Sequence, residues 1–445
     1  MANIVATNTG STVALNTRDR LYVPETVGVI VAGGIGVQAS GVQHLTLVTV
    51  DGSVVSLSYF GIFLGSDGNG FGGHTLIVGG AGVVRTIDTR SSSAIYMNGS
   101  DSAFQNWGEV TGTWGALLDD FDDGSVVNHG VIAGEWGGLS FSSSDDAHVV
   151  NSGQISGFHG IQIYNASIAL ENSGAITATG ATGNAVNATN ATDSIVVHNS
   201  GTLSAMGTAV ALGDYSDLMS NTGTVRGDIR MAGGQDIYSG ASGVVHGRVY
   251  GGAGDDQLRG GDAIDALLGE AGNDVLLGRG GDDQLTGGGG SDLLRGGNDD
   301  DTLSGGKGAD QLFGQNGDDG LSAHAGNDTL RGGRGDDLLS GGSGKDILDG
   351  GRDDDRLTGG TGADVFVFAR NAGDDTITDF ANGTDKIDLT DFGLRAASFA
   401  STVGKALSNA GGGDTLLDLG ALGGQGSVLI EGLPRAQAGA SDFIF

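Results

Sequence analysis

Aspartate recurs at every ninth residue through one block of the chain, and this spacing is the strongest chemical signal in the sequence. Residues 251–367 divide into thirteen nonapeptides without an insertion, and the block begins GGAGDDQLR, GGDAIDALL. Position six is aspartate in all thirteen repeats, whereas position eight is leucine in twelve and Phe366 in the last. A short carboxylate beside glycine suits a tight turn or a hard cation. The position-six aspartates are Asp256, Asp265, Asp274, Asp283, Asp292, Asp301, Asp310, Asp319, Asp328, Asp337, Asp346, Asp355 and Asp364.

This block resembles the GGxGxDxUx repeat of RTX (hemolysin-type) proteins, a calcium-binding β-helix repeat. The resemblance implies that the glycine-rich half of each repeat is a loop and the rest a short strand. It also implies that two repeats make one coil of a parallel β-roll. Glycine at positions one, two and four supplies backbone angles that other residues resist. We expect the leucine at position eight to point inward.

The roll geometry predicts two columns of carboxylates. Stacked coils lie about 4.8 Å apart, so position-six aspartates two repeats apart should lie one above the other and share a calcium ion. One column starts at Asp256 with six neighbouring pairs and the other at Asp265 with five, which allows up to about eleven calcium ions. Sites could be weak or empty beside the departures from the pattern, which are Ala263, Asp299, Ala323, His324 and Asp353.

The alternative is that these aspartates cap turns and bind no metal. The block contains 24 acidic and nine basic residues, so stacking its carboxylates without cations would be strongly repulsive. Calcium fits flexible, carbonyl-rich loops better than magnesium, which demands near-ideal octahedral geometry. The chain has no cysteine, so it lacks disulfides and thiolate metal ligands.

The overall charge argues against nucleic acid as a partner. The net charge is −33, and 48 of the 54 acidic residues are aspartate. Nucleic-acid binding needs basic patches. The first twenty residues lack the features of a secretory signal, and no apolar run reaches about 18 residues, so we expect no transmembrane segment.

Residues 368–445 resemble the C-terminal region of serralysin-type proteins. The resemblance implies a cap on the roll that also carries an uncleaved signal for the type I secretion apparatus. Asp442, followed by Phe443, Ile444 and Phe445, matches the acidic-then-apolar ending loosely. It implies a protein that is secreted, extracellular or cell-surface associated, from a Gram-negative bacterium. The charge density and the missing N-terminal signal lead to the hypothesis that the chain folds on binding calcium outside the cell. The alternative is a strand-rich cap alone.

A looser repeat of about 22 residues precedes the block. Asparagine recurs at positions 106, 128, 151, 172, 199 and 221, each time two residues before a glycine and near short valine- or isoleucine-rich runs. This pattern predicts coils of a larger parallel β-helix with the asparagines stacked in a ladder. Residues 45–57 and 75–84 are interpreted as weaker coils, with the N-terminal edge of the solenoid somewhere between residues 20 and 75.

Three aromatic side chains follow the asparagines at a constant spacing. Counting eight positions beyond the asparagine gives Trp114, Trp136 and His159, with Trp107 nearby. An inward-facing aromatic stack is the favoured interpretation of this column. The alternative is an exposed column that stacks on the sugar rings of an extracellular polysaccharide, beside acidic residues such as Asp122 and Asp145.

Catalytic signatures are missing from the sequence. Neither HExxH nor GxSxG occurs, and the eight histidines show no close pairing for zinc. A β-helix polysaccharide lyase or epimerase remains the alternative to a structural, adhesive or matrix role. Arg85, Arg90 and Tyr164 are possible participants, and Asp119 and Asp122 could act as an acid–base pair.

The sequence therefore predicts an all-β chain folded as a parallel β-solenoid. Residues 1–250 are expected to form a β-helix, 251–367 a calcium-binding β-roll, and 368–445 a cap with secretion information. The expected function is calcium binding in a secreted protein, with thirteen candidate metal ligands and no assigned catalytic residue.

Overall fold

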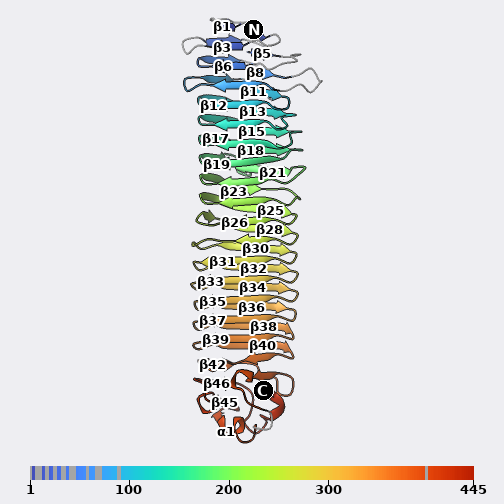
Figure 1. Cartoon of the computed structure of the whole chain (residues 1–445), viewed down its shortest axis with the longest axis vertical. Coiled ribbons are helices and arrows are strands. Elements are labelled where there is room, and N and C mark those ends of the chain that lie inside the picture. Colours follow the sequence, from blue (N-terminus) through green and yellow to red (C-terminus); the bar gives the residue numbers. More distant parts are fainter. Residues whose placement is uncertain are drawn as a thin grey trace. The chain divides into compact units, whose positions relative to one another are not determined.

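The computed structural model describes residues 3–5, 13–15, 20–23, 28–31, 37–39, 47–56, 60–65, 73–87, 92–395 and 399–445. The chain divides into an N-terminal unit, Met1–Val249, and a C-terminal unit, Tyr250–Phe445. Parallel strands dominate both units (Figure 1). The predicted fold class, an all-β parallel β-solenoid, is confirmed.

The N-terminal unit is a parallel β-helix with three faces. Face A consists of β1 (Asn3–Val5), β3 (Arg20–Val23), β6 (Leu47–Val50), β9 (Thr75–Val78), β12 (Ala103–Asn106), β14 (Ser125–Asn128), β16 (Ala147–Asn151), β19 (Ile168–Asn172), β22 (Val196–Asn199), β24 (Leu218–Asn221) and β26 (Ile237–Ser239). Each strand of this face pairs in parallel with the next.

Faces B and C share four long strands that bend around a corner. Face B consists of β4 (Gly28–Val31), β7 (Ser53–Ser56), β10 (Val83–Thr86), β17 (Gln154–Gly157), β20 (Ala175–Ala178), β27 (Val244–His246) and the first halves of the long strands. Face C consists of β2 (Val13–Leu15), β5 (Val37–Ala39), β8 (Phe60–Leu64), β11 (Ser93–Asn98), β18 (His159–Tyr164), β21 (Val186–Asn190) and the second halves. The long strands are β13 (Glu109–Asp119), β15 (Val131–Ser142), β23 (Thr202–Ala211) and β25 (Thr224–Gly233).

The predicted asparagine ladder is confirmed on face A. The side-chain amide of Asn106 donates to the Oδ1 of Asn128 at 2.8 Å, and the chain of bonds continues through all six asparagines to Asn221 at 2.7–2.8 Å. These side chains are buried, so each amide in the middle of the ladder satisfies its neighbour where water is excluded. The segments interpreted as weak coils contain β6, β7, β9 and part of β10, which pair within faces A and B.

The C-terminal unit begins as a two-faced roll. One face consists of β29 (Gln257–Arg259), β31 (Val275–Gly280), β33 (Leu293–Asn298), β35 (Gln311–Asn316), β37 (Thr329–Arg334), β39 (Ile347–Arg352), β41 (Val365–Val367) and β43 (Lys386–Asp388). The other consists of β30 (Ala266–Ala271), β32 (Gln284–Gly289), β34 (Thr302–Lys307), β36 (Gly320–Ala325), β38 (Leu338–Gly344), β40 (Arg356–Gly362) and β42 (Asp374–Ile377). β28 (Val249–Ala253) contains the boundary between the two units.

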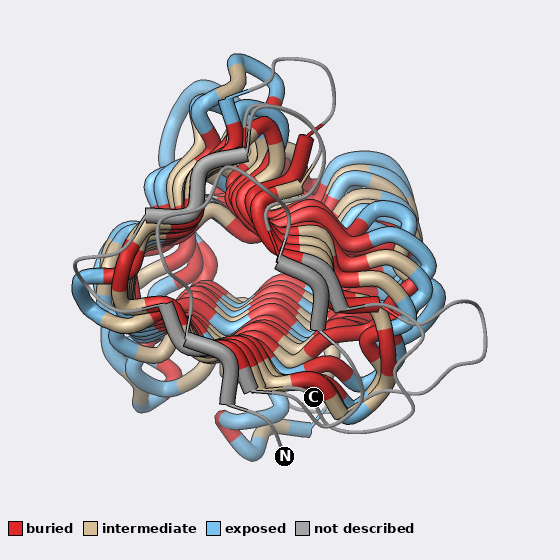
Figure 2. The backbone as a smooth tube through the Cα atoms, turned by 90° about the horizontal axis from the view of Figure 1, so that it is seen from above, coloured by how far each residue is buried: buried red, intermediate tan, exposed pale blue. Residues whose placement is uncertain are grey.

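The register of the roll repeats every eighteen residues. Leu258 pairs with Leu276, and Leu276 with Leu294, on one face. Every position-eight side chain is at most 2% exposed, so the predicted inward direction of these leucines is confirmed. Figure 2 shows buried residues on the inner side of the coils and exposed ones at the turns. Most strands span six residues, because positions one to three of the following repeat also join the parallel ladder.

Both faces of the roll end in strands contributed by the last part of the chain. β44 (Leu407–Gly411), β45 (Asp414–Asp418) and β46 (Ser427–Ile430) form an antiparallel sheet, and β46 also pairs in parallel with β42. β47 (Phe443–Ile444) pairs with β43. Short helices lie in the segment between β43 and β47: η1 (Thr390–Phe392), α1 (Val403–Ala406), η3 (Gly420–Leu422) and η4 (Ala440–Asp442). No helix in the described part of the chain has the length and hydropathy that a membrane span requires.

The ladder predicts the effect of removing one asparagine. Asn151→Ala leaves the amide of Asn128 and the Oδ1 of Asn172 without their ladder partners inside the coil, which should cost about 1–3 kcal/mol in the free energy of unfolding. Ser152→Ala, at the neighbouring exposed position, is the control and should change stability little. Chemical denaturation of both variants measures the difference, and equal stability of the two would contradict a structural role for the ladder.

Candidate metal centres

The position-six aspartates lie in the two columns that the nonapeptide spacing predicts. In each column the backbone N–H of one aspartate donates to the Oδ1 of the aspartate eighteen residues later, at 2.7–3.0 Å. All thirteen predicted residues take part in these columns. One carboxylate oxygen of each acceptor is therefore satisfied by backbone.

The second carboxylate oxygen, Oδ2, has no hydrogen-bond donor in most position-six aspartates. The position-six side chains are at most 4% exposed, and the Oδ2 of Asp265 accepts a hydrogen bond from the N–H of Gly261 at 2.8 Å. Eleven further Oδ2 atoms are buried and accept no hydrogen bond, those of Asp274, Asp283, Asp292, Asp301, Asp310, Asp319, Asp328, Asp337, Asp346, Asp355 and Asp364. A buried carboxylate oxygen without a donor is costly unless a cation neutralises it.

Glycine at position one makes room for these oxygens. A Cβ atom added to Gly269 would lie 2.2 Å from the Oδ2 of Asp274, and one added to Gly305 would lie 2.5 Å from that of Asp310. A Cβ at these places would force the carboxylate to move, and position one is glycine in every repeat except the one that begins at Ala323. Glycine at position one therefore keeps the space beside the carboxylate open.

Burial makes these carboxyl groups hard to ionise in the metal-free chain. It raises the pKa of Asp355 to about 8 and those of Asp283, Asp301 and Asp337 to about 7. Backbone donors oppose the rise, and neighbouring carboxylates add to it. Loss of solvation is the main cause.

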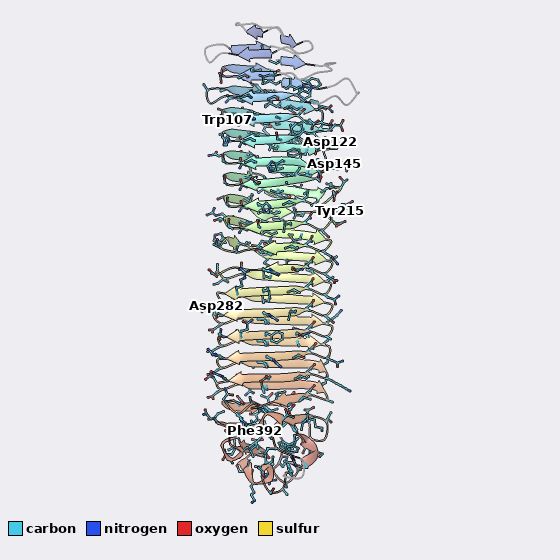
Figure 3. All side chains as sticks on the ribbon, in the orientation of Figure 1. Trp107, Asp122, Asp145, Tyr215, Asp282 and Phe392 are labelled. Carbon is cyan, nitrogen blue, oxygen red and sulfur yellow. The ribbon has the colours of Figure 1, made fainter. Side chains whose placement is uncertain are left out.

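Position five adds exposed columns that the sequence analysis missed. The N–H groups of Asp318 and Asp336 donate to the Oδ1 atoms of Asp300 and Asp318, at 2.8 and 2.9 Å. Asp282, which is labelled in Figure 3, accepts from the N–H of Asp300 at 3.3 Å. The signal was present in the sequence, because position five of alternate repeats is Asp282, Asp300, Asp318, Asp336 and Asp354.

The buried columns also continue beyond the nonapeptides. The N–H of Asp355 donates to Asp375 at 3.0 Å, and that of Asp364 donates to Asp385 at 3.1 Å. Both acceptors are at most 3% exposed. The spacing lengthens here to 20 and 21 residues, so a search in steps of nine misses them.

Two departures from the glycine pattern retain the loop conformation. Asp299 and Asp353 at position four have φ values of 74° and 75°, in the left-handed region that usually favours glycine. Their carboxylates accept hydrogen bonds from the N–H groups of Gly281 and Gly335, at 3.1 and 3.3 Å. These aspartates therefore tie neighbouring coils together.

A cation in these columns would need main-chain ligands as well. No group of three or more acidic or histidine side chains converges within the described ranges. Two stacked carboxylates can supply only part of the six to eight oxygens that calcium takes. Loop carbonyl oxygens are the remaining protein ligands of suitable chemistry, and a hard cation fits this donor set.

The predicted aromatic column is wrong. Trp114 pairs with Gly137, which in turn pairs with His159, because the register shifts by one residue after Gly112. Trp136 is therefore one residue out of line and is 62% exposed, since successive residues of a strand point to opposite sides. The inward-facing stack is wrong for the same reason.

Two of the acidic residues expected near the tryptophans, Asp122 and Asp145, lie away from Trp107. Figure 3 places Asp122 and Asp145 on the opposite side of the N-terminal unit from Trp107. Asp119 accepts hydrogen bonds from the Tyr96 hydroxyl at 3.0 Å and from the Ser142 hydroxyl at 2.6 Å, while Asp122 accepts from the N–H of Asp145.

The two possible catalytic participants that the structure describes, Arg85 and Tyr164, lie on different faces of the N-terminal unit. Arg85 belongs to β10 on face B, where it forms an ion pair with Glu109. Tyr164 ends β18 on face C and is 42% exposed. Arg90 lies outside the described residues.

The fold and these columns define residues 251–367 as a parallel β-roll of glycine- and aspartate-rich nonapeptides. The family model of the RTX calcium-binding nonapeptide repeat matches residues 250–285, 259–294, 286–321, 295–330, 322–357 and 331–366. The chain belongs to the family of proteins that carry these calcium-binding repeats.

Two solved structures are similar to parts of the chain. One is a subunit of the mannuronan C5-epimerase of Azotobacter vinelandii, with 30% identity and a TM-score of 0.24 over 33% of this chain and 78% of the subunit. The other is the extracellular lipase LipA of Serratia marcescens, with 17% identity and a TM-score of 0.20. That match covers 52% of this chain and 45% of the lipase. No curated protein matches the chain.

The raised pKa values predict an unusual dependence on pH in metal-free buffer. Burial raises the pKa values of the twelve position-six carboxyls from Asp265 to Asp364 above those in the unfolded chain, so the folded state binds more protons between about pH 4 and 8. Stability should therefore fall as pH rises through this window. Far-UV circular dichroism at about pH 4.5 and 7.5 measures it. More β structure at the higher pH in metal-free buffer would contradict the prediction, and saturating calcium should remove the trend.

Proposed function

We propose that the position-six aspartates, from Asp256 to Asp364, bind calcium between neighbouring coils, with up to about eleven ions along the two columns. Each ion would take the carboxylates of two aspartates eighteen residues apart, together with loop carbonyl oxygens. The observation that carries this proposal is the set of eleven buried Oδ2 atoms that accept no hydrogen bond. Calcium provides the positive charge that these atoms lack.

Calcium is preferred to magnesium because of the kind of ligands present. The loops offer carbonyl and carboxylate oxygens on a glycine-rich backbone, which suits the larger ion and its flexible coordination. Magnesium retains its water molecules and requires near-ideal octahedral geometry.

The proposed biological role is that of a secreted protein whose roll folds outside the cell. RTX repeats are calcium-binding, and calcium sites of extracellular modules are weak, with dissociation constants of about 0.1–1 mM. Such sites would stay empty in the cytosol and keep the roll unfolded for export. Residues 368–445 would carry the signal for the type I secretion apparatus of a Gram-negative bacterium.

The C-terminal segment supports a link between folding and export. Asp442 and Phe443 are at most 6% exposed, and β47 completes a sheet of the roll by pairing with β43. A secretion signal at this end would be accessible only before the chain folds. In this proposal, residues 1–250 form the extracellular β-helix, 251–367 the calcium-dependent roll and 368–445 the cap.

A polar surface of the N-terminal unit supports an adhesive role towards extracellular polysaccharide. Two shallow depressions of about 330 and 470 Å³ lie beside the asparagine ladder, and their linings include Ser173, His198 and His129. Trp107 is 43% exposed and packs on His129 with ring centroids 5.3 Å apart. Hydroxyl and imidazole groups beside an aromatic face are suited to a sugar chain.

The calcium proposal predicts a cooperative response. Purified full-length chain, titrated from chelator to roughly 10 mM calcium, should gain β structure by circular dichroism, and magnesium should have much less effect. Asp310→Asn removes one buried charge but keeps the Oδ1 acceptor, so it should raise the calcium midpoint. Asp282→Asn, which removes an exposed charge, should raise it less.

Two results of that titration would contradict the proposal. One is full β structure in chelator, and the other is an equal shift in the two variants.

The adhesive role predicts that binding depends on Trp107. Trp107→Ala should weaken binding to an immobilised extracellular polysaccharide, with alginate as the acidic probe and dextran as the neutral one. Trp136→Ala, which removes an exposed tryptophan outside the two depressions, is the matched control. Equal retention of both variants and the wild-type chain would argue against a sugar-binding surface beside the ladder.

A further inference from the structure

The N-terminal unit contains a pair of loops that reproduces the geometry of the nonapeptide loops outside the matched repeats. The N–H of Asp217 donates to the Oδ1 of Asp236 at 2.7 Å, and the N–H of Ile195 donates to the Oδ1 of Asp217 at 2.6 Å. These are the bonds that hold the position-six columns together. The spacing of Asp217 and Asp236 is nineteen residues instead of eighteen.

Residues 231–239, MAGGQDIYS, follow the nonapeptide conformation position by position. Ala232 at position two and Gly234 at position four have φ values of 78° and 123°, in the left-handed region that these positions occupy in the roll. Asp236 is at position six, and Tyr238 at position eight is fully buried. The sequence hides the match, because methionine and alanine stand where the repeat has its leading glycines.

The loop before it stacks against it as loops do in the roll. The N–H of Gln235 donates to the Oγ of Ser216 at 3.0 Å, the same position-five bond that Ala309 makes with Ser291 at 3.1 Å. A Cβ added to Gly234 would lie 2.6 Å from the carbonyl oxygen of Tyr215. The two backbones therefore approach as closely as neighbouring coils of the roll.

Asp217 supplies the feature that points to a ligand. Its side chain is 2% exposed, and its Oδ2 is buried and accepts no hydrogen bond. The basic residues nearest to Asp217 in the sequence are Arg226 and Arg230, which both lie on β25. The Arg230 guanidinium lies 3.8 Å from the Asp228 carboxylate. A cation beside Asp217 would satisfy the buried oxygen.

We infer that Asp217 and Asp236 form a further calcium site in the N-terminal unit, outside residues 250–366. The site takes one divalent cation of the calcium class, held by the two carboxylates and by carbonyl oxygens of the two loops. It rests on the proposed function, because it applies the same ligand geometry to new positions. It also extends calcium dependence into the β-helix.

The two tyrosines beside the site make it distinguishable from the sites of the roll. Tyr215 and Tyr238 each lie two residues from a proposed ligand, whereas the roll contains no tyrosine or tryptophan after Tyr250, at its start. Tyr250 is therefore replaced by phenylalanine in every chain used for the terbium measurement. Terbium, which replaces calcium in oxygen sites, emits when a nearby tyrosine is excited. Terbium bound to the full-length chain should therefore give tyrosine-excited emission.

The experiment counts calcium ions per full-length chain by native mass spectrometry and measures terbium emission for matched variants. Asp217→Asn keeps the Oδ1 acceptor for the Ile195 N–H and should lose one calcium ion and most of the tyrosine-excited emission. Asp193→Asn removes an exposed charge one coil earlier and should change neither. The double variant Tyr215→Phe, Tyr238→Phe keeps the ligands, so it should retain the calcium count but lose the emission.

The outcomes separate this site from the proposed function. If Asp310→Asn lowers the calcium count but Asp217→Asn does not, the further site is wrong and the roll proposal stands. If the wild-type chain binds no calcium, both are wrong. Should Asp217→Asn fail to fold, the tyrosine double variant decides, because unchanged emission in that variant overturns the site.

Discussion

Buried negative charge is the constraint on which the C-terminal unit depends. A parallel roll with a period of eighteen residues places the same position of every second repeat at one point of the cross-section, so one aspartate per repeat becomes a column of aspartates. Two carboxylates about 4.8 Å apart repel by about 3 kcal/mol at an effective dielectric constant of about 20. Eleven such pairs would exceed the whole stability of a typical domain, which is about 5–15 kcal/mol. Either protons or cations must neutralise these columns for the roll to fold.

The two units solve the problem of stacking polar side chains in different ways. An asparagine amide has both donor and acceptor, so the ladder from Asn106 to Asn221 is closed by neutral hydrogen bonds alone. An ionised carboxylate has only acceptors. In the roll, backbone N–H groups satisfy the Oδ1 atoms and leave the Oδ2 atoms to another partner. The asparagine ladder therefore needs no ion, whereas the aspartate columns need cations.

Much of this architecture could be predicted because the repeats are regular. Thirteen repeats without an insertion fix the two columns and the inward side chains, from Leu258 to Phe366. The asparagine ladder was also predictable, since an asparagine two residues before a glycine recurs about every 22 residues. In both cases one residue type, recurring once per repeat or once per coil, carries the information.

The structure departs from the sequence predictions at segments where the number of residues per coil changes. One extra residue in β15 moves Trp136 out of line with Trp114, and no local sequence signal marks the bulge. Asp375 and Asp385 were missed because the coils there are two and three residues longer than in the roll. At Asp217 and Asp236 the glycine pattern has faded while the hydrogen bonds between coils persist. Hydrogen bonds between coils keep the loop geometry of the nonapeptide even where the sequence no longer shows its glycine pattern.

Anomalous diffraction from crystals of the calcium-loaded chain tests the central claim most directly. The account predicts two rows of anomalous peaks between neighbouring position-six aspartates, each about 2.3–2.6 Å from carboxylate and carbonyl oxygens. Position-six carboxylates that turn to solvent, with no anomalous peak between the coils, would contradict it.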